Sequence, residues 1–348
     1  MKPNEPLPSV LVAMSGGVDS AVAAALLLER GHACAGLCLR LLPDAGKTAV
    51  QPAREIAGQL GIPFHVFDFS GEFEAAVLRP FAESYLRGET PNPCVRCNRH
   101  IKFPAMLARA DALGYPAVAT GHYARTEYDG RHQLRRGLDD AKDQSYFLYA
   151  LTQAQLARTR FPLGNLTKAR VRALAEERGL RCAHQPESQD ICFVPGGDYG
   201  AFLERFLGRP LPPGDFVDPR GNVLGRHRGA ARYTLGQRKG LGLALPEPGY
   251  VLAVRPENNT VVVGGEAALY SRELTARGVN LIACDSLQRP IRCQAKVRSR
   301  QEARPALAEQ LDEHTLRVLF DEPQRALTPG QAVVLYEGEY VIGGGTIV

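Results

Sequence analysis

The sequence predicts an α/β protein: a Rossmann-like parallel sheet, then a small central β-rich part, then a C-terminal antiparallel β-barrel. Three observations predict this order. Strand patterns alternate with helical patterns in the first part, a glycine-rich turn joins the first strand to the first helix, and short alternating strands fill the end. We expect domains at residues 1–200, 201–272 and 273–348.

Local composition supports each element of the first part. The strands are short, apolar runs, and the helices are rich in alanine or leucine and end at glycine. The expected strands are 9–14, 33–42, 64–68 and 117–120, and the expected helices are 21–30 and 52–60. Since ligands bind at the carboxyl ends of the strands in such sheets, we expect the site near the loop that begins at Ser15.

The rest of the chain differs from the first part in composition and in hydrophobic pattern. Residues 208–229 are rich in Gly, Pro and Arg, with several turn signals. Small apolar residues then alternate with polar ones in short runs at 292–298, 316–320 and 332–336. This spacing is typical of a small antiparallel barrel.

Composition excludes several classes of protein. The 348 residues are 45% hydrophobic and 23% charged, with a formal net charge of +5, which rules out disorder, coiled coil and collagen. The absence of Trp argues against a carbohydrate-stacking or methyl-lysine site. The first residues lack the pattern of a signal peptide and no apolar run could span a bilayer, so we expect a cytoplasmic monomer with eight reduced cysteines and no membrane association.

A glycine-rich loop, Ser15-Gly16-Gly17-Val18-Asp19-Ser20, lies between the first strand and the first helix. Glycines let the backbone approach an anion, and the helix presents its free N–H groups to it. The lysine of a Walker loop is missing, so the string resembles instead the loop of enzymes that cleave ATP between the α- and β-phosphates. Asp19 could contact Mg²⁺ or only cap the helix, and the plain alternative for the whole string is a tight turn.

Two cysteines form the pattern Cys94-x-x-Cys97 in a proline-stiffened loop, and Cys192 follows much later. The basic neighbours Arg96, Arg99 and Lys102 would lower a thiol pKa and keep a thiolate available. Structural zinc needs a fourth ligand, which His100 or His184 could supply.

Basic residues are segregated along the chain. Residues 219–240 contain six Lys or Arg and residues 286–301 contain five, and neither stretch has an acidic residue. Such segregation favours a polyanionic partner over an ordinary solvated surface.

Several longer motifs in one order resemble those of the bacterial tRNA-specific 2-thiouridylases of the PP-loop ATP pyrophosphatase superfamily. The resemblance covers nearly the whole chain. Its motifs are Ser15–Ser20, Thr90–Asn98, Ala119–Arg125, Lys142–Leu148, Ser188–Phe193, Tyr233–Gly242 and Gly343–Gly345.

The resemblance implies an adenine nucleotide alpha-hydrolase-like fold and an ATP- and Mg²⁺-dependent exchange of the 2-oxygen of the tRNA wobble uridine for sulfur. The uracil oxygen would be adenylated, and thiols would then deliver sulfur to the activated carbon. The partners would be tRNA and a sulfur donor, either a sulfur-relay protein, a cysteine desulfurase or sulfide.

By the same resemblance, the family's site residues fall on matching positions. Cys97 is the nucleophile and Cys192 carries the persulfide. The ATP-binding positions are Ala13, Met14, Ser15, Gly16, Gly17, Val18, Asp19, Ser20, Leu39 and Gly121. The target base meets Asn92, Pro93 and Cys94, and tRNA meets His122, Lys142, Asp143, Gln144, Arg298, Ser299 and Gln331.

Two positions depart from the family pattern. The family commonly has Asp where this chain has Cys94, and Tyr where it has Ser299. Thiolates from Cys94, Cys97 and Cys192 could hold a 4Fe–4S cluster with one open iron, so a cluster and a persulfide relay both stay open. An ATP-dependent amidating synthetase and a non-catalytic RNA-binding protein are the alternative functions.

Overall fold

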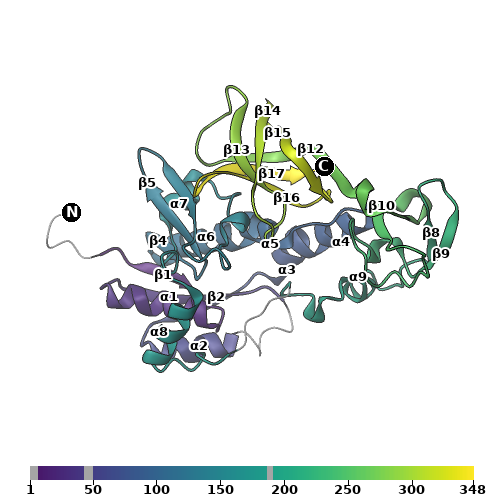
Figure 1. The fold of residues 1–348 in the computed structure, drawn as a ribbon. Coiled ribbons are helices and arrows are strands. Elements are labelled where there is room, and N and C mark those ends of the chain that lie inside the picture. Colours follow the sequence, from purple (N-terminus) through teal and green to yellow (C-terminus); the bar gives the residue numbers. More distant parts are fainter. Residues whose placement is uncertain (1–6, 43–49, 186–190) are drawn as a thin grey trace.

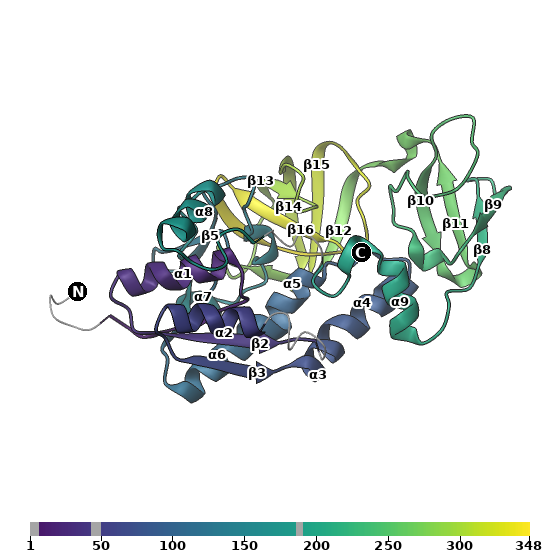
Figure 2. The same ribbon diagram turned by 90° about the horizontal axis from the view of Figure 1, so that it is seen from below.

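The computed structural model describes residues 7–42, 50–185 and 191–348. Figure 1 shows the parallel sheet and its helices at one end, the β-barrel above them, and the small central domain to one side. Figure 2 shows from below that α4 and α9 connect the sheet region to the central domain. The expected class, a parallel-sheet domain followed by two β-rich domains, is confirmed.

The first sheet has five parallel strands in the order β3-β2-β1-β4-β7. Its strands are β1 (Val10–Ala13), β2 (Cys34–Arg40), β3 (Phe64–Asp68), β4 (Ala117–Ala119) and β7 (Thr159–Arg160). The chain runs outward from β1 to β3 on one side and then returns to β4 on the other. This switch point between β1 and β4 is where ligands bind in open parallel sheets.

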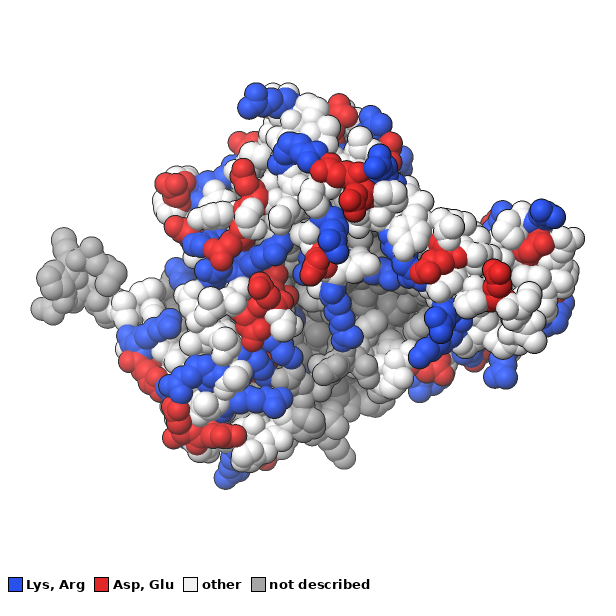
Figure 3. Space-filling view, viewed as in Figure 1, with Lys and Arg blue, Asp and Glu red and all other residues white. Residues whose placement is uncertain are grey.

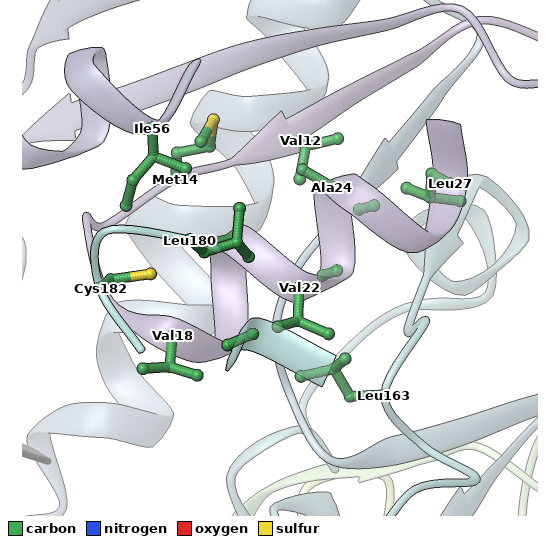
Figure 4. Close-up of a cluster of buried hydrophobic side chains, with 14 of the residues drawn as sticks. Val12, Met14, Val18, Val22, Ala24, Leu27, Ile56, Leu163, Leu180 and Cys182 are labelled. Carbon is green, nitrogen blue, oxygen red and sulfur yellow. The ribbon is translucent and has the colours of Figure 1, made fainter. Parts of the chain in front are cut away.

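The α-helices are α1 (Val18–Glu29), α2 (Val50–Gln59), α3 (Ser70–Phe73), α4 (Arg79–Leu86), α5 (Pro93–Cys97), α6 (Phe103–Leu113), α7 (Gln153–Arg158), α8 (Lys168–Glu177) and α9 (Tyr199–Leu207). Helices cover both faces of the sheet, with α1 and α2 on one face and α6 on the other. Strand β1 alternates between two cores: Val10 and Val12 pack with residues of α1, and Leu11 packs against α6. Figure 4 shows the first of these cores, with Val22 and Leu27 of α1 among the buried side chains.

Two helices contain π-helical segments. Segment η2 (Glu74–Leu78) joins α3 to α4, and η3 (Asn98–Lys102) joins α5 to α6. The second one begins directly after Cys97. Single π turns inside helices are frequent at functional sites because they reorient the side chains next to them.

The C-terminal barrel is closed by the pairing of its first strand with its last. Its strands are β12 (Tyr270–Leu281), β13 (Ile291–Lys296), β14 (Arg304–Asp312), β15 (Thr315–Arg325), β16 (Ala332–Glu337) and β17 (Tyr340–Ile347). A hairpin from the first part of the chain, β5 (Ala124–Tyr128) and β6 (His132–Arg136), continues this sheet through a contact of Arg135 with Tyr340. The division at residues 200 and 272 stays a prediction, since this hairpin joins the barrel.

The central domain is a four-stranded sheet in the order β10-β11-β8-β9. Its strands are β8 (Gly214–Val217), β9 (Val223–His227), β10 (Tyr250–Arg255) and β11 (Thr260–Gly264). They enclose a small core that includes Phe216, Tyr233 and Val251. The motif Tyr233–Gly242 therefore belongs to a folded domain rather than to a linker.

Among the described residues, no helix combines the length and apolar character needed to cross a membrane.

Candidate active site

A cavity of about 630 Å³ lies at the switch point of the parallel sheet. It collects residues from most of the motifs that the sequence singled out. Its lining includes Ala13, Met14, Ser15, Asp19, Ser20, Leu39, Pro93, Cys94, Cys97, Asn98, Lys102, Gly121, His122, Gln144 and Cys192. Gly16, Gly17 and Val18 complete the loop behind the lining residues, as its turn and the start of α1.

The loop after β1 is built around Ser20. Its hydroxyl donates to the Gly17 carbonyl oxygen at 3.0 Å and accepts from the Ser15 backbone N–H at 3.2 Å. Gly17 caps α1 without a side-chain hydrogen bond, so no side chain of the cap occupies the first N–H groups of the helix. A helix N-terminus at the edge of a cavity is a suitable place for a phosphate group.

Gly121 lets the end of β4 approach this loop closely. A Cβ atom at Gly121 would lie 2.8 Å from the Asp19 carbonyl carbon and 2.9 Å from the Ser20 nitrogen. Only glycine fits there without displacing the main chain of the loop. The resemblance-based placement of Gly121 beside the nucleotide loop thus has a steric reason.

The carboxylate of Asp19 is held by two partners from other elements. Its Oδ1 accepts a hydrogen bond from the Tyr123 hydroxyl at 2.8 Å and lies 2.6 Å from Nζ of Lys168. Lys168 begins α8 and is nearly buried. Sequence reasoning missed Lys168, because no spacing or motif links a lysine 149 positions away to the loop.

The two cysteines of the Cys-x-x-Cys pattern lie on a helix, and the expectation of a loop is wrong. The Asn92 side chain accepts from the Val95 N–H at 3.2 Å, and Pro93 occupies the first turn, so both residues start α5. Three residues apart on this helix, Cys94 and Cys97 lie on one face and both line the cavity. Cys192 reaches the same cavity from the segment after residue 190.

Desolvation inside the cavity raises the pKa of all three thiols, although only Cys97 is a buried residue and Cys94 and Cys192 are exposed; the value for Cys192 reaches about 11. The charge of Lys102, which also lines the cavity, acts in the opposite direction on each thiol. Arg96 and Arg99 instead donate to the Ala76 and Gly278 carbonyl oxygens. The expectation of lowered thiol pKa values is therefore wrong, because the loss of hydration outweighs the single cation facing the sulfurs.

Two polar residues that match the family's tRNA positions face this cavity. The His122 ring stacks on Phe103, and its Nδ1 lies 2.7 Å from the Thr120 hydroxyl. Burial lowers the pKa of His122 well below its ordinary value, so the ring is neutral. Gln144 accepts from the Tyr123 N–H at 3.0 Å and lines the cavity beside it.

The other residues matched to tRNA binding make contacts within the protein. Asp143 accepts hydrogen bonds from Gly137 and Ser145, and Gln331 donates to the Thr90 carbonyl oxygen at 2.9 Å. Arg298 donates to the Thr328 hydroxyl at 2.8 Å. Lys142 follows a turn closed on Asp139, and Ser299 is half-buried beside Arg298. None of these five residues is among those that line the cavity.

The described residues contain no group of three or more Cys, His, Asp or Glu side chains placed to hold a metal ion. Cys94, Cys97 and Cys192 line one cavity without converging as a ligand set. His100 and His184 do not complete a zinc site in the described ranges either. The 4Fe–4S cluster that the sequence left open beside a persulfide relay stays a hypothesis. The first residues of the motif that ends at Phe193, Ser188–Asp190, lie outside the described residues.

The two acid-free stretches do not form purely basic surfaces. Arg226 pairs with Asp215, Arg232 with Glu204 and Arg292 with Asp321, in each case with an acid distant in sequence. Figure 3 shows acidic and basic side chains interspersed over the barrel. The fold therefore brings acidic side chains from other parts of the chain next to the basic residues of these two stretches. The exposed basic residues of these stretches are Arg220, Arg226, Arg228, Arg238, Lys239, Arg289, Arg292 and Arg300.

Three family models match consecutive parts of the chain. They are described as the tRNA methyl transferase HUP domain at residues 8–196, the tRNA methyl transferase PRC-barrel domain at 200–265 and the aminomethyltransferase beta-barrel domain at 271–347. A solved 4-thiouridine synthetase–RNA complex with bound ATP is 18% identical with a TM-score of 0.39, covering 57% of this chain and 50% of that one, which is too distant to support an inference.

Curated relatives align over almost their full length. The tRNA-specific 2-thiouridylase MnmA of Moorella thermoacetica is 50% identical over 97% of this chain and 98% of its own. The enzyme of the same name from Acetivibrio thermocellus is 48% identical over 97% of this chain and 98% of its own. This chain belongs to the tRNA-specific 2-thiouridylase family.

Proposed function

We propose that this protein adenylates the 2-oxygen of a tRNA wobble uridine with ATP and then replaces that oxygen by sulfur through Cys97 and Cys192. Family membership makes the chain a tRNA-uridine 2-sulfurtransferase. One observation carries the proposed chemistry. The loop suited to the phosphates of ATP and the two thiols line one cavity, so both half-reactions can act on one base.

Activation is needed because a carbonyl oxygen is a very poor leaving group. We assign the phosphates to the loop of Ser15–Ser20 and the first turn of α1, with the close approach of Gly121 keeping that loop in place. Attack of the uracil 2-oxygen on the α-phosphorus would release pyrophosphate and leave AMP on the base, while the N3 proton passes to pyrophosphate or solvent and returns to N3 when 2-thiouridine departs. Asp19 is the carboxylate that could hold Mg²⁺ together with phosphate oxygens, and the ion would neutralise charge on the leaving pyrophosphate.

Lys168 fits the same step. In the structure it neutralises Asp19, whose side chain would otherwise place an unpaired negative charge next to the phosphate site. Leu39, Ala13 and Met14 supply apolar lining on the strand side of the cavity, where the adenosine would lie.

The target uridine must leave the stacked anticodon loop to enter such a cavity, as is usual for chemistry on a base. We assign Asn92, Pro93 and Cys94 to the side of the cavity that receives it, since they start the helix that carries Cys97. His122 and Gln144, which also line the cavity, would contact the flipped uridine. We assign Lys142, Asp143, Arg298, Ser299 and Gln331 to contacts with the bound anticodon arm.

Sulfur transfer then proceeds in two steps, one for each cysteine. A persulfide on Cys192, charged by the donor, would attack C2 with its terminal sulfur, and AMP would leave with the former 2-oxygen. Cys97 would attack Sγ of Cys192, so that an internal disulfide forms and the 2-thiouridine departs with the transferred sulfur. A thiol reductant would restore both cysteines. Both cysteines line the same cavity, which is the arrangement that this exchange needs.

The proposal routes no step through an iron–sulfur cluster, because the three thiols do not converge as ligands among the described residues. Iron and sulfide analysis of anaerobically purified protein tests this choice. We expect active protein that is colourless and free of iron. Activity that scales with bound iron would replace the persulfide route by a cluster held by Cys94, Cys97 and Cys192.

The experiment for the whole proposal joins two readouts in one reaction. Unmodified tRNA is incubated with the protein, ATP, Mg²⁺ and a persulfide donor, and both pyrophosphate and the nucleoside composition are measured. We expect pyrophosphate release that requires tRNA, together with 2-thiouridine at the wobble position. Pyrophosphate release that requires a small acid or amide would point to a synthetase, and none at all would point to a non-catalytic RNA-binding protein.

A further inference from the structure

Before activation, uracil carries a feature that distinguishes it from cytosine. Its reacting oxygen at C2 lies next to N3–H, a hydrogen-bond donor, where cytosine has an acceptor. An enzyme that encloses this base has to supply an acceptor for N3–H, because a buried donor without a partner costs about 1–3 kcal/mol. None of the residues assigned above to the target base supplies this acceptor.

Asn98 is placed to be that acceptor. It directly follows Cys97 at the start of the π-helical segment η3, lines the same cavity and is only 3% exposed. Its Nδ2 donates to the Phe147 carbonyl oxygen at 3.0 Å. A carbonyl oxygen only accepts, so this contact fixes the orientation of the carboxamide and directs Oδ1 away from Phe147.

The oxygen of this carboxamide is unsatisfied. Within the described parts of the chain, Oδ1 of Asn98 is buried and has no hydrogen-bond partner. Buried polar atoms are nearly always paired, and an unpaired one beside a reaction cavity indicates a partner that arrives with the substrate. The partner of Oδ1 should be a neutral hydrogen-bond donor. A cation would be repelled by Lys102, which lines the same cavity, and a hydrogen-bond acceptor would be repelled by Oδ1 itself.

We propose that Asn98 accepts a hydrogen bond from N3–H of the target base and thereby selects uridine over cytidine. This inference rests on the proposed function and names the residue that sets its base specificity. In the free protein Oδ1 is shielded from solvent, so the contact forms when base entry shifts the neighbouring side chains. With cytidine, two acceptors would face each other and the base would not settle next to Cys97.

A substrate change and a residue change together test the contact. The target uridine of an anticodon stem–loop is replaced by 3-deazauridine, in which C–H takes the place of N3–H. Single-turnover thiolation is then compared for the wild type and Asn98→Ala on both substrates. The effect of the replacement on the intrinsic reactivity of O2 is common to both proteins and cancels in the ratio.

We expect the replacement to slow the wild type about ten- to a hundredfold more than it slows Asn98→Ala. Equal losses in the two proteins would overturn the proposal. Should Asn98→Ala fail to fold, Asn98→Leu, which keeps the side-chain volume but lacks the oxygen, takes its place in the same ratio. Thiolation of the unmodified uridine substrate by the wild type, measured in the same series, tests the proposed function separately.

Discussion

Replacing Gly121 by alanine tests how closely the end of β4 must approach the nucleotide loop. The added Cβ would lie 2.8, 2.9 and 3.0 Å from main-chain atoms of Asp19 and Ser20, whereas ordinary contact begins at 3.4 Å. The loop or β4 must therefore move by about half an ångström, and main chain in the first turn of a helix cannot rotate away as a side chain can.

The expected cost has two parts. Overpacking of this kind lowers the free energy of unfolding by about 1–3 kcal/mol. Misplacement of the loop relative to the cavity raises the KM for ATP by about ten- to a hundredfold, because catalysis is sensitive to shifts below 1 Å. The assay is tRNA-dependent pyrophosphate release over a range of ATP concentrations, combined with urea unfolding of the same preparations.

Gly58→Ala is the matched control. A Cβ atom at Gly58 in α2 would meet no atom within 4 Å, so this change should leave the KM for ATP unaltered and raise stability by about 0.5–1 kcal/mol. An unaltered KM in Gly121→Ala would refute the steric argument, and so would an equal increase in both variants.

The remaining predictions concern the thiols, the Asp19 pair and tRNA binding. Cys97→Ser and Cys192→Ser should each abolish 2-thiouridine formation but keep tRNA-dependent pyrophosphate release, and turnover in either variant would remove that cysteine from the site. The pKa of Cys192 is raised to about 11 from 9.0, so its alkylation by iodoacetamide at pH 7–8 should be about a hundredfold slower than that of an unperturbed thiol. The alkylation rate should still rise with pH above 9, and a plateau of the rate below pH 8 would contradict the raised pKa. Lys168→Met should lower the free energy of unfolding by about 1.5–3 kcal/mol because Asp19 loses its cation, with partial recovery in Lys168→Arg, and an unchanged urea midpoint would disprove the pairing. If about five phosphates are neutralised, a plot of log affinity for tRNA against log salt should have a slope of about −3.5 to −4.5, and a flat plot would exclude ionic binding.

Much of the first domain could be predicted from local sequence. The short apolar run that contains Val10, Leu11 and Val12 and the glycines after it encode a strand and a turn within a few residues, so β1 was foreseeable, whereas α1 begins at Val18, three residues before the expected start. Strand β7 was not, because its two residues, Thr159 and Arg160, carry no pattern and pair only through β4. The hairpin that ends at Arg136 was missed for a related reason, since it is completed by a strand more than 200 residues away.

The site divides in the same way. Several motif residues, such as Ser15, Pro93 and Gly121, reach the cavity because they follow a parallel strand or begin a helix, which sequence can indicate. The pairing of Lys168 with Asp19 and the unsatisfied oxygen of Asn98 depend on tertiary contacts, which no spacing encodes. The raised thiol pKa values were missed because the sequence shows basic neighbours but not the burial that outweighs them.

The most direct measurement follows one sulfur atom. The protein is charged with a radiolabelled persulfide, freed of donor, and mixed with tRNA in the presence or absence of ATP for a single turnover. We expect that label leaves Cys192 and enters the wobble uridine only when ATP is present, with a disulfide between Cys97 and Cys192 left behind. Label that stays on the protein, or that reaches the tRNA without ATP, would contradict the view that one cavity joins base activation to sulfur transfer.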